Sequence, residues 1–285
     1  MSAGPNVHLI SRQDREHPRR VAAPAAISVS GLAYSVRKRS GETLAILDNI
    51  NLMVADGEFV AIVGPSGCGK STLLNFLARL LPVQSGRVEV FGSSTGPVKG
   101  TVGYMFQQHA LFPWRTVLRN TELGLEIQGS DRLERRQRCL DILAQLGLQG
   151  FADHYPSQVS GGMRQRISLA RTLVGNPRIV LMDEPFGALD AQTKMLVQEL
   201  FLAFWEKHRR TVLFVTHDLD EAIALSDRVI VMSARPGRVL SEYTIDLPRP
   251  RHLDALRTST RLLQYRKQLW EDLRDEAMKV LRDKP

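Results

Sequence analysis

Hydrophobic positions near the start of the chain follow the period of β-strands. Apolar and polar residues alternate along residues 27–36 and again along residues 50–54, which predicts half-buried strands. Residues 58–63 form a nearly continuous apolar run, and residues 86–91 and 102–105 add two shorter strands. The first third of the chain is therefore expected to be rich in β-structure.

The apolar spacing then changes to three and four residues. Residues 117–174 are expected to be helical, with breaks at Gly129, at residues 147–150 and at Pro156. Strands at 179–182, 211–216 and 228–232 then alternate with helices at 191–207 and 219–225. In the first of these helices, the side chains expected in the core are Met195, Leu196, Leu200, Phe204 and Trp205. Such alternation predicts an α/β fold, with a parallel sheet flanked by helices.

Both ends of the chain differ from this central region. Residues 1–26 are polar, contain three prolines and show no periodicity, so we expect a flexible leader. Residues 246–285 form a tail that closes with an amphipathic helical pattern, made by Leu262, Leu269, Leu273, Ala277 and Val280. This helix is expected to pack on the main domain, and the alternative is a partner-binding helix.

Composition narrows the class of protein. The chain has 285 residues, of which 43% are hydrophobic and 24% charged, as in ordinary globular proteins. It contains no apolar run of membrane-spanning length and no signal-peptide core, so we expect the chain in the cytoplasm. The net charge of +8 admits an anionic membrane surface or nucleic acid as a partner, but the basic residues are spread out. Two cysteines without metal-ligand spacing indicate a reducing compartment.

Residues 64–72 carry a chemical signature. They fit G-x-x-x-x-G-K-[ST], the pattern of phosphate-binding loops, between a predicted strand and a helix expected at 73–81. The glycines let backbone N–H groups close around phosphate oxygens, and the helix start adds a favourable dipole. Lys70 is expected to reach the β- and γ-phosphates, and Ser71 to offer its hydroxyl to Mg²⁺. The nucleotide-binding residues expected here are Gly64, Pro65, Ser66, Gly67, Cys68, Gly69, Lys70, Ser71 and Thr72.

A pair of carboxylates supplies the chemistry that such a loop needs. The apolar strand at 179–182 ends in Asp183 and Glu184. Successive side chains of a strand point in opposite directions, so the two acids can have separate roles. We expect Asp183 to hold Mg²⁺ and Glu184 to act as general base toward the attacking water. The alternative is that the two acids only end a strand at the protein surface. The phosphate loop upstream in the same chain makes this alternative much less favoured.

A second predicted helix N-terminus lies at residues 160–165, where small residues leave the backbone N–H groups accessible. Ser160, Gly161 and Gly162 lead into a helical pattern, which could bind an anion at the helix N-terminus. The alternative is that Ser160 caps the helix by accepting a hydrogen bond from an unpaired N–H group. The segment taken alone favours the cap.

Together, these segments resemble the ATP-binding-cassette (ABC) ATPases. Residues 64–72 resemble the Walker A loop, residues 179–184 Walker B, and residues 159–163 the signature motif, with Val159 in place of the usual leucine. Residues 186–190 resemble the D-loop, 216–218 the switch histidine and 106–107 the Q-loop. The resemblance runs in order from about residue 27 to 245. It implies a P-loop NTPase core with a mostly parallel sheet, an N-terminal antiparallel β part and an inserted α-helical subdomain at about 108–176.

The resemblance also implies roles for individual residues. Gln107 would contact Mg²⁺ and the water, and would couple the site to a membrane partner. His217 would hold the γ-phosphate. The residues that would bind the ATP of an opposite subunit are Ser160, Gly161, Gly162, Met163 and Gln165. Ala188, Leu189 and Asp190 would organise the interface of a homodimer. The implied cofactors are ATP and Mg²⁺.

One position departs from the family pattern. ABC ATPases usually stack an aromatic side chain on adenine just after the first strand, which here corresponds to Val36. Tyr34 lies two residues earlier and is the candidate for this contact from a shifted position. The alternative is that apolar contacts alone hold the base.

Within the family, the chain resembles a stand-alone importer subunit. It holds one cassette and no membrane spans. Residues 111–117 and 247–251 resemble the nitrate/sulfonate/taurine import group. The implied partners are a membrane permease and a periplasmic or extracellular substrate-binding protein, with the chain on the cytoplasmic face of the cell membrane. No nucleic acid is expected. The alternative function is a non-transport ABC ATPase that acts on nucleic acid or another complex, which salt-sensitive nucleic-acid binding would reveal.

Overall fold

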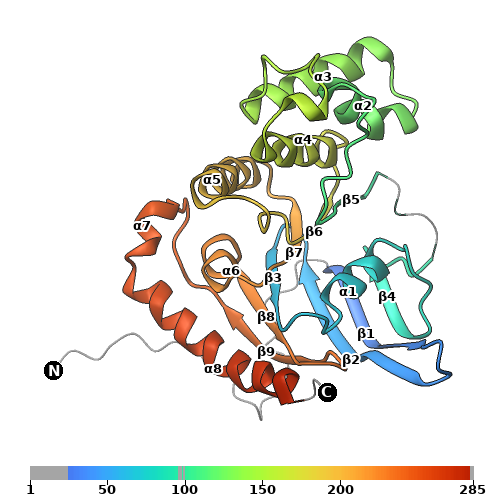
Figure 1. Cartoon of the computed structure of the whole chain (residues 1–285), viewed down its shortest axis with the longest axis vertical. Coiled ribbons are helices and arrows are strands. Elements are labelled where there is room, and N and C mark those ends of the chain that lie inside the picture. The colour runs from blue at the N-terminus through green and yellow to red at the C-terminus, as the bar shows by residue number, and fades with distance from the viewer. Residues whose placement is uncertain (1–24, 96–97, 99, 283–285) are drawn as a thin grey trace.

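Two sheets and their helices make up the molecule in the computed structural model, which describes residues 25–95, 98 and 100–282 (Figure 1). The leader expected at 1–26 therefore lies outside the described residues except for Ala25 and Ala26, which already belong to the first strand. A group of helices stands at the top of Figure 1, apart from the two sheets.

The smaller sheet is antiparallel and has the strand order β2-β1-β4. Its strands are β1 (Ala25–Arg37), β2 (Thr43–Ala55) and β4 (Ser85–Val90). The second of these strands is longer than the predicted residues 50–54, since it pairs with β1 back to Thr43. Gly86 of β4 has φ +83°, and a Cβ there would lie 2.4 Å from the backbone of Gly31 in β1. The backbones of β4 and β1 therefore approach each other closely at this point. The predicted N-terminal antiparallel part is confirmed.

The larger sheet has six strands in the order β5-β6-β7-β3-β8-β9. They are β3 (Phe59–Val63), β5 (Val102–Met105), β6 (Ile179–Asp183), β7 (Thr211–Val215), β8 (Arg228–Met232) and β9 (Val239–Thr244). All neighbours pair in parallel except β8 and β9. Strands β3, β6 and β7 are buried along their whole length, as expected of strands covered on both faces. The α/β fold with a mostly parallel sheet is confirmed, and β9 is a strand that the sequence did not predict.

Helix α1 (Lys70–Leu77) follows β3 and packs beside β4 and β6. It begins three residues before the predicted start and ends before Leu81. The helices at the top of Figure 1 are α2 (Val117–Ile127), α3 (Arg132–Gln145) and α4 (Gly161–Leu173), with a 3₁₀ turn at Pro156–Gln158. These helices pack mainly on one another. They lie between β5 and β6 in the chain and form the inserted helical part.

Helix α5 (Ala191–His208) buries a face that matches the predicted one only in part. Of the five side chains expected in the core, Trp205 is fully buried, Leu200 and Phe204 are half-buried against the core, and Leu196 is 48% exposed. The buried side chains are Val197, Gln198, Phe201, Leu202 and Trp205. Apolar residues occur on several faces of this helix, so their spacing could not select the face that packs on the sheet.

The C-terminal tail wraps along the main domain, at the lower left of Figure 1. The tail contains helices α7 (Leu253–Arg257) and α8 (Thr260–Arg282), and α8 packs against β8 and against α6 (Leu219–Leu225), which lies between β7 and β8 in the chain. Leu262 and Leu269 are buried there. Of the pattern expected for this helix, Leu273 and Ala277 are half-buried, and the side chain of Val280 lies outside the described part.

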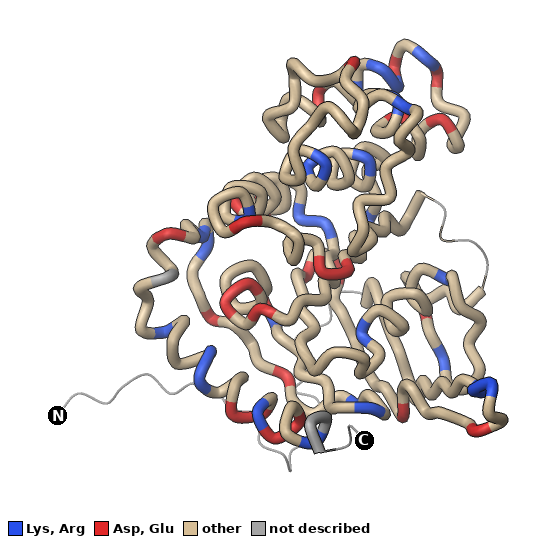
Figure 2. The backbone as a smooth tube through the Cα atoms, viewed as in Figure 1, with Lys and Arg blue, Asp and Glu red and all other residues tan. Residues whose placement is uncertain are grey.

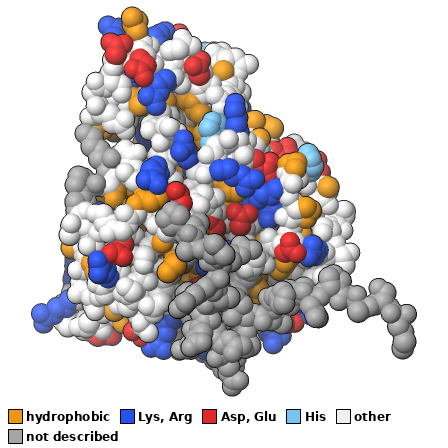
Figure 3. Space-filling model, turned by 180° about the vertical axis from the view of Figure 1, so that it is seen from behind, with side chains coloured by type: hydrophobic (Ala, Val, Ile, Leu, Met, Phe, Trp, Pro, Cys, Tyr) orange, Lys and Arg blue, Asp and Glu red, His pale blue; other side chains and the backbone are white. Residues whose placement is uncertain are grey.

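Charged residues are spread along the whole backbone rather than gathered on one element (Figure 2). On the face shown in Figure 3, basic side chains lie beside acidic ones. Near the C-terminus, Arg249 pairs with Asp227 at 2.8 Å, and the guanidinium of Arg251 is buried among five backbone carbonyl groups. These two arginines therefore fasten the tail to α6 instead of forming a basic surface.

Candidate nucleotide site

The phosphate loop turns between the end of β3 and the start of α1. Gly67 and Gly69 have φ of +75° and +107°, a region that suits glycine and opens the backbone N–H groups to one side. Lys70 is 7% exposed, and its ammonium donates to the carbonyl oxygens of Gly64 at 2.8 Å and Pro65 at 2.9 Å. The loop therefore holds its own lysine in place. Burial raises the pKa of the Cys68 thiol, which keeps this loop residue neutral.

Ser71 and Asp183 meet beside the loop, as the sequence predicted for a shared metal site. The Ser71 hydroxyl donates to Asp183 Oδ1 at 2.9 Å, although the two residues are 112 positions apart in the chain. They meet because β6 runs parallel to β7, which lies next to β3, so their carboxyl ends reach the same edge of the sheet. Burial raises the pKa of Asp183, an effect that a bound cation would oppose.

Glu184 lies at the centre of the second group. Its carboxylate accepts a hydrogen bond from Gln107 at 3.1 Å and lies 3.3 Å from His217 Nδ1. Glu184 has φ +45°, an uncommon backbone conformation for a residue with a side chain, and strain of this kind is frequent at functional sites. Gln107 and His217, each just beyond the end of a different strand, therefore both contact Glu184.

The signature segment lies elsewhere. Ser160 caps α4, because its hydroxyl accepts a hydrogen bond from the Met163 N–H at 3.2 Å, so the predicted capping role is present. In Figure 1, α4 lies in the upper helical group, away from α1. Gln165 is 2% exposed and interacts with His109 inside that group. Gly162 faces α5, where an added Cβ would lie 2.1 Å from Thr193 Cγ2.

Asp190, the expected interface residue, caps α5 by accepting a hydrogen bond from Thr193 N–H at 3.0 Å. Its neighbours Leu189, half-buried, and Ala188, exposed, form the turn that precedes this helix. One turn further along, Lys194 forms ion pairs with Asp218 at 2.7 Å and with the buried Glu221 at 2.8 Å. These contacts connect the start of α5 to the loop that carries His217.

Tyr34 packs edge-on against Phe76 of α1, with 5.1 Å between the ring centroids. It is half-buried in the core cluster between the small sheet and this helix. Its proposed contact with adenine stays a prediction.

The sequence did not reveal a set of residues that touch the outer side of the phosphate loop. Arg235, in the turn between β8 and β9, donates two hydrogen bonds to the Gly67 carbonyl oxygen. Gly237 approaches so closely that a Cβ there would lie 2.1 Å from the Cys68 carbonyl oxygen. The only available signal was the turn-forming sequence Arg-Pro-Gly at 235–237, which indicates a turn without indicating what it contacts.

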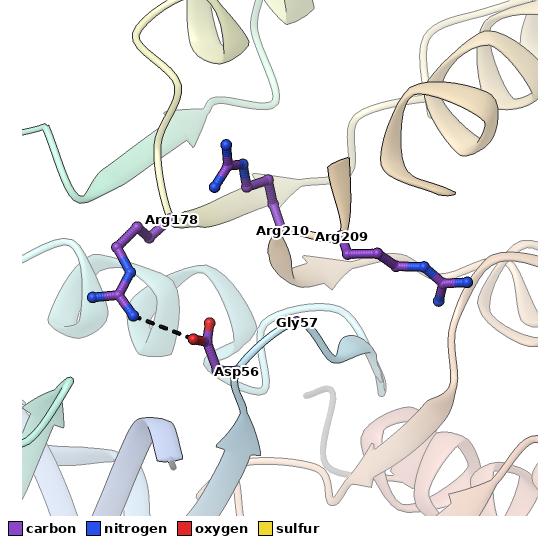
Figure 4. A pocket seen from close by; sticks show the side chains of 5 residues that line it. All are labelled: Asp56, Gly57, Arg178, Arg209 and Arg210. Carbon is purple, nitrogen blue, oxygen red and sulfur yellow. Dashed lines mark hydrogen bonds and ion pairs between the residues drawn. The ribbon is translucent and has the colours of Figure 1, made fainter. Parts of the chain in front are cut away.

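A cavity of about 320 Å³ lies at the opposite edge of the large sheet (Figure 4). Its lining residues are Asp56, Gly57, Arg178, Arg209 and Arg210, which directly precede the parallel strands β3, β6 and β7. Figure 4 shows the three guanidinium groups pointing in different directions. Arg178 is also neutralised by Asp56 at 3.2 Å. Cations that diverge in this way do not form a second phosphate site.

Comparisons with known proteins agree with this geometry. The family model described as "ABC transporter" matches residues 47–187. The chain is 49% identical over 243 residues to an uncharacterised ABC transporter ATP-binding protein of Methanocaldococcus jannaschii, covering 85% of this chain and 90% of that protein. The chain therefore belongs to the ABC transporter family and is an ATP-binding ABC ATPase, as the sequence predicted.

Two relatives with more specific names lie within this family. The taurine import ATP-binding protein TauB of Rhizobium johnstonii is 44% identical over 211 residues, covering 74% of this chain and 80% of TauB. The aliphatic sulfonates import ATP-binding protein SsuB of Bacillus cereus is 41% identical over 225 residues, covering 79% of this chain and 88% of SsuB. The fold matches a dimeric bacterial ABC transporter cassette, MJ0796, with a TM-score of 0.70 and 35% identity, covering 78% of this chain and all of that one.

Proposed function

We propose that this protein is the ATP-hydrolysing subunit of an importer that takes up a small anion of the nitrate, sulfonate or taurine type through a separate permease. The observation that carries the proposal is the contact of Gln107 and His217 with Glu184 beside the phosphate loop. The taurine and sulfonate import relatives support the direction of transport and the class of solute. None of the described helices combines the length and apolarity needed to cross a bilayer.

Each residue of the site has a definite role in this proposal. Residues 64–72 hold the phosphates with backbone N–H groups, and Lys70 leaves its loop carbonyls to bind the β- and γ-oxygens. Glu184 takes a proton from the attacking water, and His217 donates a hydrogen bond to the γ-phosphate. Gln107 keeps Glu184 oriented and extends toward the permease. Tyr34 contacts the adenine.

The residues beside the loop fit Mg²⁺. Hydroxyl, carboxylate and amide oxygens are the ligands this ion prefers, and Ser71, Asp183 and Gln107 present these groups at one edge of the sheet. When bound, the ion neutralises charge on the phosphate oxygens. The partly buried Asp183 would lose part of the desolvation penalty that raises its pKa.

Two copies of the chain form the working unit in this proposal. The dimeric cassette to which the chain is similar supports this arrangement. The opposite subunit supplies Ser160, Gly161, Gly162, Met163 and Gln165 to the ATP, and Ala188, Leu189 and Asp190 line the interface. The dimer lies on the cytoplasmic face of the membrane, bound to the permease, and a substrate-binding protein delivers the solute outside. ATP drives closure because it binds the closed dimer better than the open one.

The first prediction tests the proposed general base. Glu184→Gln keeps the size and the hydrogen-bonding shape of the side chain but removes the proton acceptor. The variant is expected to bind ATP, to dimerise in its presence and to lose at least about a hundredfold in turnover, the scale of one general base. Size-exclusion chromatography with ATP and a phosphate-release assay measure the two effects. Turnover at the rate of the unmodified protein would remove Glu184 from this role.

Function as an importer is tested by reconstitution. The protein, its permease and the substrate-binding protein in liposomes are expected to accumulate nitrate, taurine or an alkanesulfonate only when ATP is present on the side of this subunit. Uptake should cease in the Glu184→Gln variant. ATP hydrolysis without uptake of any of these anions would contradict the solute class while leaving the ATPase intact.

A further inference from the structure

The carbonyl group of Gly67 lies on the outer side of the phosphate loop and accepts hydrogen bonds from a guanidinium group. Arg235 donates to this oxygen from Nε at 3.1 Å and from a terminal nitrogen at 2.8 Å. Both bonds are charge-assisted and therefore stronger than those between neutral groups. They hold a glycine whose φ of +75° is one of the two left-handed positions of the loop.

This contact acts on the side of the loop that faces phosphate. In a trans peptide unit the carbonyl and the N–H point in opposite directions, so the guanidinium on the Gly67 carbonyl lies behind the Cys68 N–H. A cation there polarises the peptide and makes that N–H a stronger donor, because linked hydrogen bonds reinforce one another. In the structure, the Cys68 N–H has only a long contact to the Pro65 carbonyl oxygen, at 3.4 Å.

The turn that carries Arg235 is itself firmly held. Gly237 donates to the Ile46 carbonyl at 2.9 Å and accepts from the Asp48 N–H at 3.0 Å, which ties the turn to β2. On its other side, the Ala234 N–H donates to the carboxylate of Glu276 in α8 at 2.8 Å. Glu276 is only 5% exposed, so the tail helix offers a fixed acceptor. The guanidinium is therefore supported by a rigid frame although it is itself exposed.

We propose that Arg235 is a positioning residue of the phosphate loop: it fixes the Gly67–Cys68 peptide from behind and so strengthens the binding of the ATP phosphates. The inference rests on the proposed role of residues 64–72 in phosphate binding. It adds a residue from the β8–β9 turn that does not touch the nucleotide. The tail helix contributes through Glu276, which holds the turn in place.

Arg235→Ala in the full-length chain tests the inference, with MgATP and MgADP as probes in isothermal titration calorimetry. The variant is expected to bind both nucleotides about fivefold more weakly, the effect of losing one charge-assisted contact at an exposed site. The KM for ATP should rise by a similar factor, while kcat at saturating ATP stays within about twofold, since uniform binding energy is lost. Arg235→Lys should recover part of the affinity, because it keeps the charge but not the forked geometry.

Arg238→Ala is the matched control. Arg238 is exposed on the same turn, but it pairs with Asp48 instead of the loop, with one contact at 2.8 Å. Amide hydrogen exchange without nucleotide distinguishes positioning from general destabilisation. Exchange in residues 64–70 should rise in Arg235→Ala while β7 stays protected, and neither should change in Arg238→Ala.

Two results would overturn the inference. One is an Arg235→Ala variant that binds ATP as tightly as the unmodified protein. The other is an equal loss of affinity in Arg238→Ala, which would assign the effect to the turn as a whole. If the unmodified protein itself failed to bind ATP, the proposed function would fall and this inference with it, so the two failures are distinguishable.

Discussion

At the scale of single residues, Gly162 shows how packing can impose a residue type that also has a proposed ligand role. A Cβ at this position would lie 2.1 Å from Thr193 Cγ2, where α4 meets α5. The predicted contact of Gly162 with the ATP of an opposite subunit needs a backbone that no side chain covers. The packing of α4 on α5 separately requires a glycine, because a Cβ would clash with Thr193. The two demands can be separated by mutation.

Gly162→Ala is expected to lower the free energy of unfolding by about 1–3 kcal/mol, the usual effect of overpacking. Adding Thr193→Ser removes the clashing methyl group and keeps the hydroxyl, so the double variant should recover most of the loss. Urea denaturation followed by circular dichroism measures both. Gly150→Ala, where an added Cβ meets nothing within 4 Å, is the control. A double variant as unstable as the single one would show that Thr193 is not the cause.

At the same scale, the sequence predicted the residues of the site better than their supports. Ser71, Asp183 and Glu184 could be assigned because a phosphate loop and a strand-end acid pair each have a local pattern. Arg235 and Lys194 could not, since each acts on a segment far away in the chain and nothing near either residue indicates its partner. Such supports become visible only when the strands are assembled.

At the scale of elements, α5 connects the proposed interface segment to the loop that carries His217. Lys194 bridges Asp218 and Glu221, Gln198 donates to Glu221 at 2.7 Å, and Thr216 bonds the same carboxylate. Burial raises the pKa of Glu221, so its charge depends on these partners. This group of residues is a buried ionic network, and removing Lys194 leaves the Glu221 carboxylate without a cation.

Lys194→Met is expected to lower the free energy of unfolding by about 3 kcal/mol, because Glu221 then lacks its cation in a buried place. Lys207→Met, on an exposed position near the end of the same helix, should change stability by less than about 0.5 kcal/mol. Chemical denaturation at pH 7 compares the two. Equal stability of both variants would mean that the network contributes nothing to folding.

The sequence predicted most elements because their apolar patterns are unambiguous. β3, β6 and β7 are short, continuously apolar runs and were placed within a residue or two. The buried face of α5 was predicted only in part, since Leu196 and Val197 are equally apolar and only the sheet decides which one is covered. β9 was missed because Val239 to Thr244 mixes apolar and polar residues, and its strand form depends on the edge that β8 offers.

At the scale of the whole molecule, an exposed aromatic side chain marks one end of the helical group. Trp114 is 71% exposed and lies 5.3 Å from Phe112 between ring centroids, close in sequence to Gln107. An exposed tryptophan is typical of the centre of a protein interface. It lies seven residues after Gln107, which is proposed to extend toward the permease.

Trp114→Ser is expected to weaken assembly with the permease by about tenfold or more, since truncation of a central aromatic often costs over 2 kcal/mol of binding. ATP affinity of the isolated subunit should stay the same. Leu133→Ser, at a position that is 79% exposed in the same helical group, is the control. Co-purification with the permease in detergent measures assembly, and unimpaired assembly of Trp114→Ser would place the contact elsewhere.

The position of Arg251 has a consequence for how relatives of this protein can diverge. Its side chain satisfies the carbonyl oxygens of Ile223, Ala224, Ser226, Ile245 and Leu247, and burial lowers its pKa to about 10. Backbone carbonyl groups that are buried away from water need a hydrogen-bond donor from the protein. A homologue that shortens its C-terminus before this point, or replaces the arginine, must therefore rebuild the end of α6 at the same time, so the two regions can change only together.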